Sequence, residues 1–196
     1  MAQVSPIKDS ICDALISMME KQPFYKIKVI ELIKVAGVSR STFYIHFDSI
    51  YAVLQQIEDE FINGLPEERK ISHGIAVEAD ILAGFEYIEG KLQVFKALCG
   101  PHGDPAFQAR LANRSKRLLE KTLVSLPSKR TKAENSMIVE FLAGGQWNLY
   151  RWWAFHADEV SSEEVYQLTQ EMVSMIHGLL KSNQVPIDLW ATGPGR

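Results

Sequence analysis

Apolar residues recur three and four positions apart through most of the chain, which is the spacing that one face of an α-helix requires. Runs that alternate apolar with polar residues, as half-buried strands do, are nearly absent. The pattern therefore predicts an all-α protein. Helices are expected over residues 6–21, 28–36, 39–47, 48–64, 75–89, 91–99, 104–125, 132–156 and 161–182.

Residues that favour helix ends support several of these boundaries. Ser5 precedes the first helix, Gly37 follows the second, and Ser39 is placed to cap the third. The fourth helix starts at a cap that either Asp48 or Ser49 supplies.

The second and third helices are short, and the turn between them contains a glycine, so together they have the form of a helix-turn-helix. We expect a three-helix helix-turn-helix DNA-binding domain over residues 1–47. A larger helical domain of about six helices is expected over residues 48–196. The helix over 48–63 connects the two domains, and the polar stretch 66–74 is the best linker candidate.

Charge limits how this chain can bind nucleic acid. The whole sequence has a net charge of −3, which argues against binding by bulk positive charge. Residues 1–47 contain six basic and four acidic side chains, so this region carries +2 and the remainder of the chain carries −5. DNA affinity must therefore rest on a few well-placed contacts.

Cysteine usage and hydropathy narrow the class of protein further. Cys12 and Cys99 lie far apart and form no CxxC motif, so we expect core side chains and no zinc site or disulfide framework. No window approaches the roughly 18 consecutive apolar residues of a membrane helix. We expect a cytoplasmic protein with no bound metal, cofactor or membrane.

The start of the third helix carries the residue types that contact DNA. Short donors and acceptors at a helix N-terminus can approach phosphates and base edges in the major groove. Arg40 can bind guanine N7 and O6 together, or a phosphate. Tyr44 and His46 lie near the exposed side of a helix whose Phe43 and Phe47 point inward, where they can hold phosphates. The candidate DNA contacts in this helix are Ser39, Arg40, Ser41, Thr42, Tyr44 and His46.

The stretch from Ile27 to Phe47, with its run AGVSRSTFYIHF, resembles the DNA-binding segment of the tetracycline-repressor-like (TetR/AcrR) family of bacterial transcription regulators. The resemblance implies a homodimer whose second domain binds a ligand and dimerises through its last two long helices. It also implies that Tyr44 contacts the DNA backbone. Lys28 stands where the family usually has a hydroxyl residue touching phosphate, and a lysine can act there as a point charge.

One position departs from the family pattern. The family commonly has a lysine two or three residues after the phenylalanine that corresponds to Phe47, where this chain has Ser49 and Ile50. Asp48, which precedes them, would repel the DNA backbone if it faced DNA. The alternative is that Asp48 only caps the fourth helix.

The last two long helices each carry an apolar seam with spacings of three and four residues. Two such seams can pair with their two-fold copies as a four-helix bundle, although they can also pack within one subunit. The candidate dimer-interface residues are Ile138, Leu142, Gly145, Leu149, Trp152, Leu168, Met172, Met175 and Leu179.

Aromatic residues are concentrated in the helix over 132–156, which holds six of them. One helix cannot bury all six in a single stripe, so some must face a second surface. That surface is either additional core or a pocket for a small apolar or aromatic effector. The candidate pocket residues are Phe85, Ile88, Phe107, Leu111, Phe141 and Trp147.

The sequence favours a transcription regulator over an enzyme, because it contains no HExxH, GxSxG, P-loop or GxGxxG motif. We therefore predict a ligand-responsive homodimeric repressor that binds a pseudo-palindromic double-stranded DNA operator. The alternatives are the same fold acting as a protein-binding adaptor, or as an activator without effector-released DNA binding.

Overall fold

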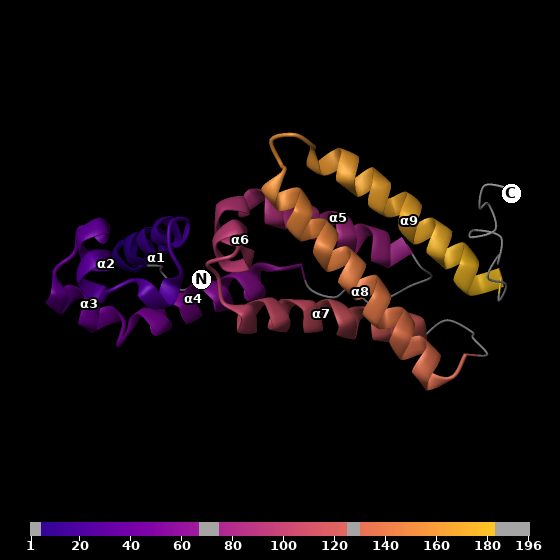
Figure 1. The fold of residues 1–196 in the computed structure, drawn as a ribbon, viewed down its shortest axis with the longest axis horizontal. Coiled ribbons are helices and arrows are strands. Elements are labelled where there is room, and N and C mark those ends of the chain that lie inside the picture. The colour runs from indigo at the N-terminus through magenta and orange to yellow at the C-terminus, as the bar shows by residue number, and fades with distance from the viewer. Residues whose placement is uncertain (1–4, 67–74, 125–129, 183–196) are drawn as a thin grey trace, which may run out of the picture.

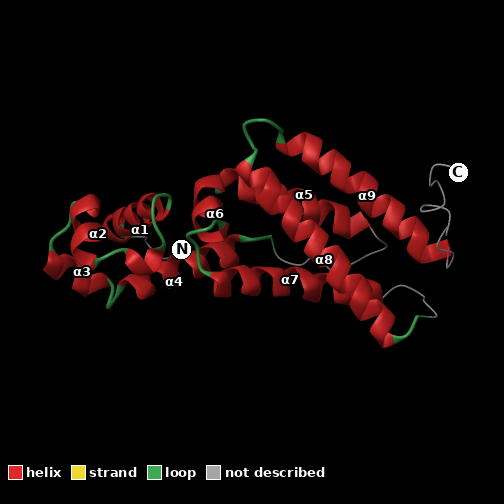
Figure 2. Cartoon of the chain, viewed as in Figure 1, coloured by secondary structure: helices red, strands yellow, loops and turns green. Residues whose placement is uncertain are grey.

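The computed structural model describes residues 5–66, 75–124 and 130–182, and this part of the chain is helical and contains no strand (Figure 2). The all-α prediction is therefore confirmed. The helices are α1 (Pro6–Met19), α2 (Val29–Ala36), α3 (Arg40–His46), α4 (Ile50–Gly64), α5 (Ile75–Gly90), α6 (Leu92–Cys99), α7 (Pro105–Val124), α8 (Lys132–Phe155) and α9 (Ser162–Ser182), with a short 3₁₀ turn, η1 (Phe24–Lys26).

The helices form a small head and a larger body. In Figure 1, α1, α2 and α3 lie together at one end, α4 leads away from them, and α5 to α9 make up the other end. Within the head, α1 packs against α2 and α4. Within the body, α8 packs along α7, α9 packs against α5, and the short α6 contacts α7 and α8.

The two parts share one hydrophobic core, which α4 carries from the head into the body. Its inward residues are Val53, Leu54, Ile57 and Phe61, and all four are buried. The Phe61 ring meets the rings of three body residues, at centroid distances of 5.2, 6.0 and 6.0 Å. Those residues are Tyr87 of α5, Phe95 of α6 and Phe107 of α7.

Polar contacts add a second connection between the head and the body. His102, in the loop between α6 and α7, makes a 2.9 Å hydrogen bond from Nδ1 to the carbonyl oxygen of Met19 at the end of α1. The Gln93 amide of α6 donates to the Glu20 carboxylate over 2.9 Å. These two hydrogen bonds therefore connect the end of α1 to the body at a point separate from α4.

The structure decides between the two candidate caps of α4. Ser49 is the N-cap residue, and its Oγ accepts the Ala52 N–H over 3.2 Å. Asp48 is exposed and makes no capping bond, so the interpretation of Asp48 as the cap is wrong. Ser5 has the N-cap position of α1, but its side chain makes no cap hydrogen bond.

Both cysteines are buried, as expected for core side chains. Burial raises the pKa of the Cys12 thiol to about 12, and it raises that of Cys99 as well. The described residues contain no cluster of His, Cys, Asp or Glu that could hold a metal ion. None of the described helices is long and apolar enough to cross a membrane.

A buried carboxylate lies where α4 meets α7. Glu58 is only 4% exposed, and the Arg110 guanidinium donates hydrogen bonds to its Oε2 and to Asp59 Oδ1. Glu58 Oε1 has no hydrogen-bond partner in the described part of the chain. Burial raises the pKa of Glu58 to about 7, although Arg110 acts in the opposite direction.

The raised pKa predicts how stability changes with pH. Glu58 has an ordinary pKa of 4.5, so the folded state keeps its full advantage below that pH and loses it as the pH rises through about 7. Because Glu58→Gln has no carboxyl group at this position, we expect its free energy of unfolding to fall by about 1 to 3 kcal/mol less than that of the wild-type protein over this pH range. Urea denaturation at about pH 5 and about pH 8 measures it.

Glu86→Gln is the matched control, because Glu86 is an exposed carboxylate on α5. It should keep the pH dependence of the wild-type protein. Equal pH dependence in Glu58→Gln and the wild-type protein would show that the pKa of Glu58 is not raised.

Candidate nucleic-acid interface and internal cavity

The turn between α2 and α3 fixes the position of α3. Gly37 has φ +67°, a left-handed conformation that residues with a side chain adopt at a cost, and it ends α2 as predicted. The Val38 N–H then donates to the Ile33 carbonyl over 3.0 Å. On the inner side of α3, Phe43 is fully buried and Phe47 is 5% exposed. These two rings anchor α3 so that its opposite side faces outward.

Three hydroxyl groups are joined at the start of α3. Ser39 is the N-cap, and its Oγ accepts the Thr42 N–H over 3.0 Å. The same oxygen lies 2.8 Å from Ser41 Oγ and 2.7 Å from Thr42 Oγ1. Ser39 and Thr42 therefore hold the first turn of α3, whereas Arg40 and Ser41 are exposed and available to a ligand.

The outward side of α3 carries a stripe formed by Arg40, Ser41, Tyr44 and Ile45, which follow helical spacings of one, three and four residues. The Arg40 guanidinium lies 5.8 Å from the centre of the Tyr44 ring, so the ring supports it. Ile45 is 77% exposed. Ile45 is not among the contacts predicted from the sequence because it is apolar, although its position four residues after Ser41 and opposite Phe43 places it on the outward side.

The other predicted contacts lie around this stripe. Lys28 is exposed immediately before α2, and its backbone N–H donates to the Glu31 carboxylate over 3.2 Å. His46 is half-buried in the last turn of α3. Asp48 is exposed just beyond α3. The structure thus brings Arg40, Ser41 and Tyr44 together on one surface and places His46 further inward.

A half-open cavity of about 100 Å³ lies in the body, between the end of α4 and helices α5 to α8. Of the six predicted pocket residues, Ile88, Leu111 and Trp147 line it. The expectation for Phe85, Phe107 and Phe141 is not met. Phe85 and Phe107 are buried in the core, and Phe141 is 77% exposed on the outside of α8. Helical spacing does not show which neighbour an apolar side chain meets, and this explains the error.

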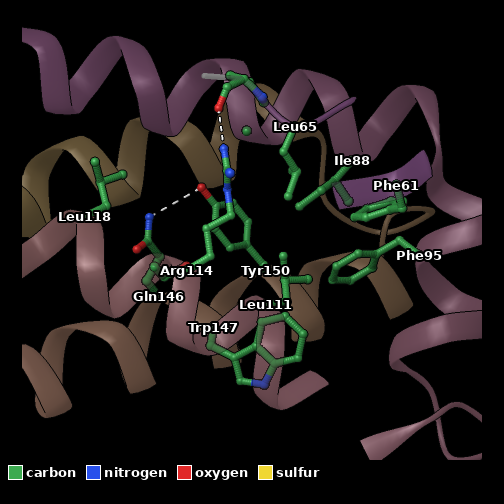
Figure 3. Close-up of a pocket in the computed structure, with 13 residues that line it drawn as sticks. Phe61, Leu65, Ile88, Phe95, Leu111, Arg114, Leu118, Gln146, Trp147 and Tyr150 are labelled. Atoms are coloured by element: carbon green, nitrogen blue, oxygen red, sulfur yellow. Dashed lines mark hydrogen bonds between the residues drawn. The ribbon is translucent and has the colours of Figure 1, made fainter. Parts of the chain in front are cut away.

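Polar groups occupy one end of the cavity, as Figure 3 shows. The Arg114 guanidinium donates to the Pro66 carbonyl over 2.6 Å, just after α4 ends. Gln146 donates to the Tyr150 hydroxyl over 3.4 Å. Burial raises the pKa of Tyr150 to about 12, so this hydroxyl keeps its proton. The sequence analysis named none of these three side chains as a pocket residue.

Each of α8 and α9 carries an exposed apolar stripe. On α8 it consists of Met137, Phe141 and Trp152, which are 64%, 77% and 48% exposed. On α9 it consists of Leu168, Met172 and Met175, which are 50%, 44% and 62% exposed. Four of these residues are predicted dimer contacts, and Gly145 is exposed on the same side of α8.

The other three predicted dimer contacts on α8 and the last one on α9 are placed differently. Ile138, Leu142 and Leu149 are half-buried at the flank of the stripe, and Leu149 packs against the core. The side chain of Leu179 lies outside the described residues.

Comparisons with known proteins agree with this architecture. Residues 77–175 match the family model described as "Transcriptional regulator C-terminal region", a TetR-type model. A TetR transcriptional regulator from Streptococcus agalactiae 2603V is 23% identical, with 85% of this chain and 93% of that chain covered and a TM-score of 0.63. The regulator TylP from Streptomyces fradiae is 16% identical, with 95% and 90% covered and a TM-score of 0.56.

A third solved structure, the dihydroxyacetone kinase operon activator DhaS, is 17% identical, with 90% of this chain and 97% of that chain covered and a TM-score of 0.59. No curated protein sequence matches the chain. The fold is that of a transcription regulator with a helical head and a helical body. The chain belongs to the TetR family of transcriptional regulators.

The hydroxyl cluster at the start of α3 generates a stability prediction. Removing the cap oxygen with Ser39→Ala should cost about 1 kcal/mol, because the Thr42 N–H loses its acceptor. Chemical denaturation followed by circular dichroism measures the loss. Ser41→Ala, which removes a neighbouring hydroxyl outside the cap position, should cost less than about 0.5 kcal/mol. Equal losses in the two variants would show that the cap bond does not stabilise α3.

Proposed function

We propose that this protein is a sequence-specific DNA-binding regulator. Residues 1–47, the head, form its DNA-binding domain, and α3 is the recognition helix. The observation that carries the proposal is the outward stripe of Arg40, Ser41 and Tyr44 on a helix anchored by Phe43. A helix held in this way can enter the major groove with its N-terminal residues against base edges. We infer that it acts on DNA in the cytoplasm.

Each exposed residue of the stripe has a distinct part in this proposal. Arg40 binds a guanine edge or a phosphate, and Ser41 binds a base or the backbone. Tyr44 donates its hydroxyl to a phosphate. Ile45, which is 77% exposed, contacts a thymine methyl group, the apolar feature of the major groove.

Residues at the edge of the stripe make secondary contributions. Lys28 and His46 hold flanking phosphates, while Ser39 and Thr42 act mainly through the helix cap that positions Arg40. Asp48, exposed beside α3, weakens phosphate binding at one point. With only +2 on the head, operator affinity depends weakly on salt compared with strongly basic DNA-binding domains.

We further propose that the protein is a homodimer formed through α8 and α9. The large apolar side chains exposed on these two helices support this, because such side chains, where they gather on a surface, mark sites of interaction with other proteins. A two-fold dimer presents two copies of α3, so it matches a pseudo-palindromic operator. Phe141, which the sequence suggested for the pocket, belongs to this interface in the proposal.

A small apolar or aromatic effector in the cavity of the body controls the spacing of the heads. Phe61 and Leu65, at the end of α4, line the cavity, so an occupant contacts the helix that leads to the head. A ligand that favours one position of α4 changes operator affinity by a coupling free energy of typically about 1 to 3 kcal/mol. In this proposal the ligand-free protein occupies the operator and ligand binding releases it, so the protein acts as a repressor.

A second candidate function is transcription activation with the same DNA-binding head. Its support is that one structural neighbour, DhaS, is named an operon activator, and the fold is common to both types of regulator. A protein-binding adaptor is the remaining alternative, and the polar start of α3 argues against it because an apolar partner groove leaves those groups unsatisfied.

Operator selection from random DNA, followed by Arg40→Ala, tests the DNA-binding proposal. We expect selection to enrich a pseudo-palindrome, and Arg40→Ala to weaken binding to it by about 1 to 3 kcal/mol. Relaxed specificity at one base pair identifies a base contact, whereas uniform weakening with a smaller salt slope identifies a phosphate contact. Electrophoretic mobility or fluorescence anisotropy at several salt concentrations measures both.

Arg117→Ala is the matched control, since Arg117 is an exposed arginine on α7, in the body. It should leave operator affinity unchanged. Failure to enrich any sequence would contradict the DNA-binding function, and unchanged binding by Arg40→Ala would remove Arg40 from the interface.

Phe141→Glu tests the dimer. Each copy of the interface would then bury a carboxylate against an apolar surface, which should weaken dimerisation more than about 100-fold. Sedimentation velocity should show a species of twice the 22.2 kDa chain mass for the wild-type protein and one of 22.2 kDa for the variant. Ile30→Glu, at a 69% exposed residue of α2 in the head, should stay dimeric. A dimeric Phe141→Glu protein would place the interface elsewhere.

A further inference from the structure

The cavity in the body has one charged side chain among the described residues that line it. Arg114 carries this charge, and the other side chains are apolar or neutral. Arg114 is half-buried on α7. A positive charge in mostly apolar surroundings needs a partner that compensates it.

Within the described residues, the partner of Arg114 is neutral. Its guanidinium donates to the Pro66 carbonyl, which lies 2.6 Å from Nη2. No ion pair of Arg114 exists within the described part of the chain, in contrast to Arg110 one turn earlier on α7, which pairs with Glu58 and Asp59. A guanidinium has five N–H donors, so Arg114 keeps donors for a second acceptor.

Neighbouring side chains make this end of the cavity a polar site. Figure 3 shows the Arg114 side chain beside the Tyr150 ring, with Gln146 and the Tyr150 hydroxyl nearby. The carbonyl of Pro66 holds the guanidinium in place from the far side. A carboxylate can therefore accept two hydrogen bonds from the guanidinium, a geometry that Arg favours strongly.

The opposite end of the cavity is apolar. Phe61, Phe95 and Trp147 line it, together with Ile88 and Leu111. Side chains of this kind favour an aromatic ring or a short alkyl chain. The cavity volume of about 100 Å³ is close to the roughly 150 Å³ of an engineered cavity that holds benzene, so the ligand is small.

We propose that the cavity binds a small organic monocarboxylate, with its carboxylate on Arg114 and its aromatic ring or short alkyl chain against Phe61, Phe95 and Trp147. This inference rests on the proposed effector function and gives its ligand class. It also connects the ligand to α4, because the guanidinium that would hold the carboxylate also donates to the Pro66 carbonyl, and Pro66 lies just after the end of α4.

Matched pairs of acids and amides test the ligand class. The probes are benzoate, phenylacetate, 3-phenylpropanoate and hexanoate, each compared with its primary amide, which has nearly the same shape and no charge. Isothermal titration calorimetry with the full-length protein near neutral pH measures both members of each pair. We expect at least one acid to bind about tenfold or more tightly than its amide, as hydrogen bonds to charged groups allow.

Arg114→Gln and Arg117→Gln give the matched variants, because both arginines lie on α7 and only Arg114 lines the cavity. Arg114→Gln should reduce the acid-to-amide ratio to about one while amide binding persists, which shows that the cavity is intact. Arg117→Gln should keep the wild-type ratio. Arg114→Lys should fall between them, since a lysine keeps the charge and loses the two-pronged geometry.

Three results would overturn the proposal: no acid binds the wild-type protein, the amides bind as tightly as the acids, or the preference for acids persists in Arg114→Gln. None of these results concerns operator binding, which is measured separately without ligand. An acid that binds through Arg114 and leaves operator affinity unchanged would support the ligand class and contradict its regulatory role. The failures of the two proposals are therefore distinguishable.

Discussion

The packing of α4 is the constraint on which both parts of the molecule depend. At its beginning α4 packs against α1, and in its last turns the Phe61 ring contacts Tyr87, Phe95 and Phe107 of the body. Because interiors are close-packed, this helix cannot shift in one part without disturbing contacts in the other. The head has no independent core of its own, and the position of α3 is set relative to the body through α4.

The same helix also brings the two proposed binding sites into communication. Phe61 and Leu65 line the cavity, and Pro66 accepts a hydrogen bond from Arg114 immediately after the helix ends. The ion pair of the buried Glu58 with the exposed Arg110 lies one turn before Phe61, between α4 and α7. Apolar contact, a neutral hydrogen bond and a charged pair thus all act on the last turns of α4. In the proposed function, a cavity occupant would act through the first two.

The sequence predicted the features that depend on local spacing and on helix ends. The helix boundaries, the inward positions of Phe43 and Phe47, and the inward face of α4 follow from periodicity and capping preferences. Contacts between helices were not predictable in this way. Phe141 was assigned to a pocket and is exposed, while Arg114 was not singled out and lies in the cavity. Periodicity gives the face of a helix, and tertiary packing decides what that face meets.

The polar contacts at the end of α1 limit how such regulators can be recombined. His102 and Gln93 of the body bind Met19 and Glu20 of the head, so the head is recognised by its own body at side-chain level. A chimaera that joined this head to another body would keep these hydrogen bonds only if that body supplied the same partners. In the proposed function, operator specificity is therefore easier to exchange through the few outward residues of α3 than through transfer of the whole head.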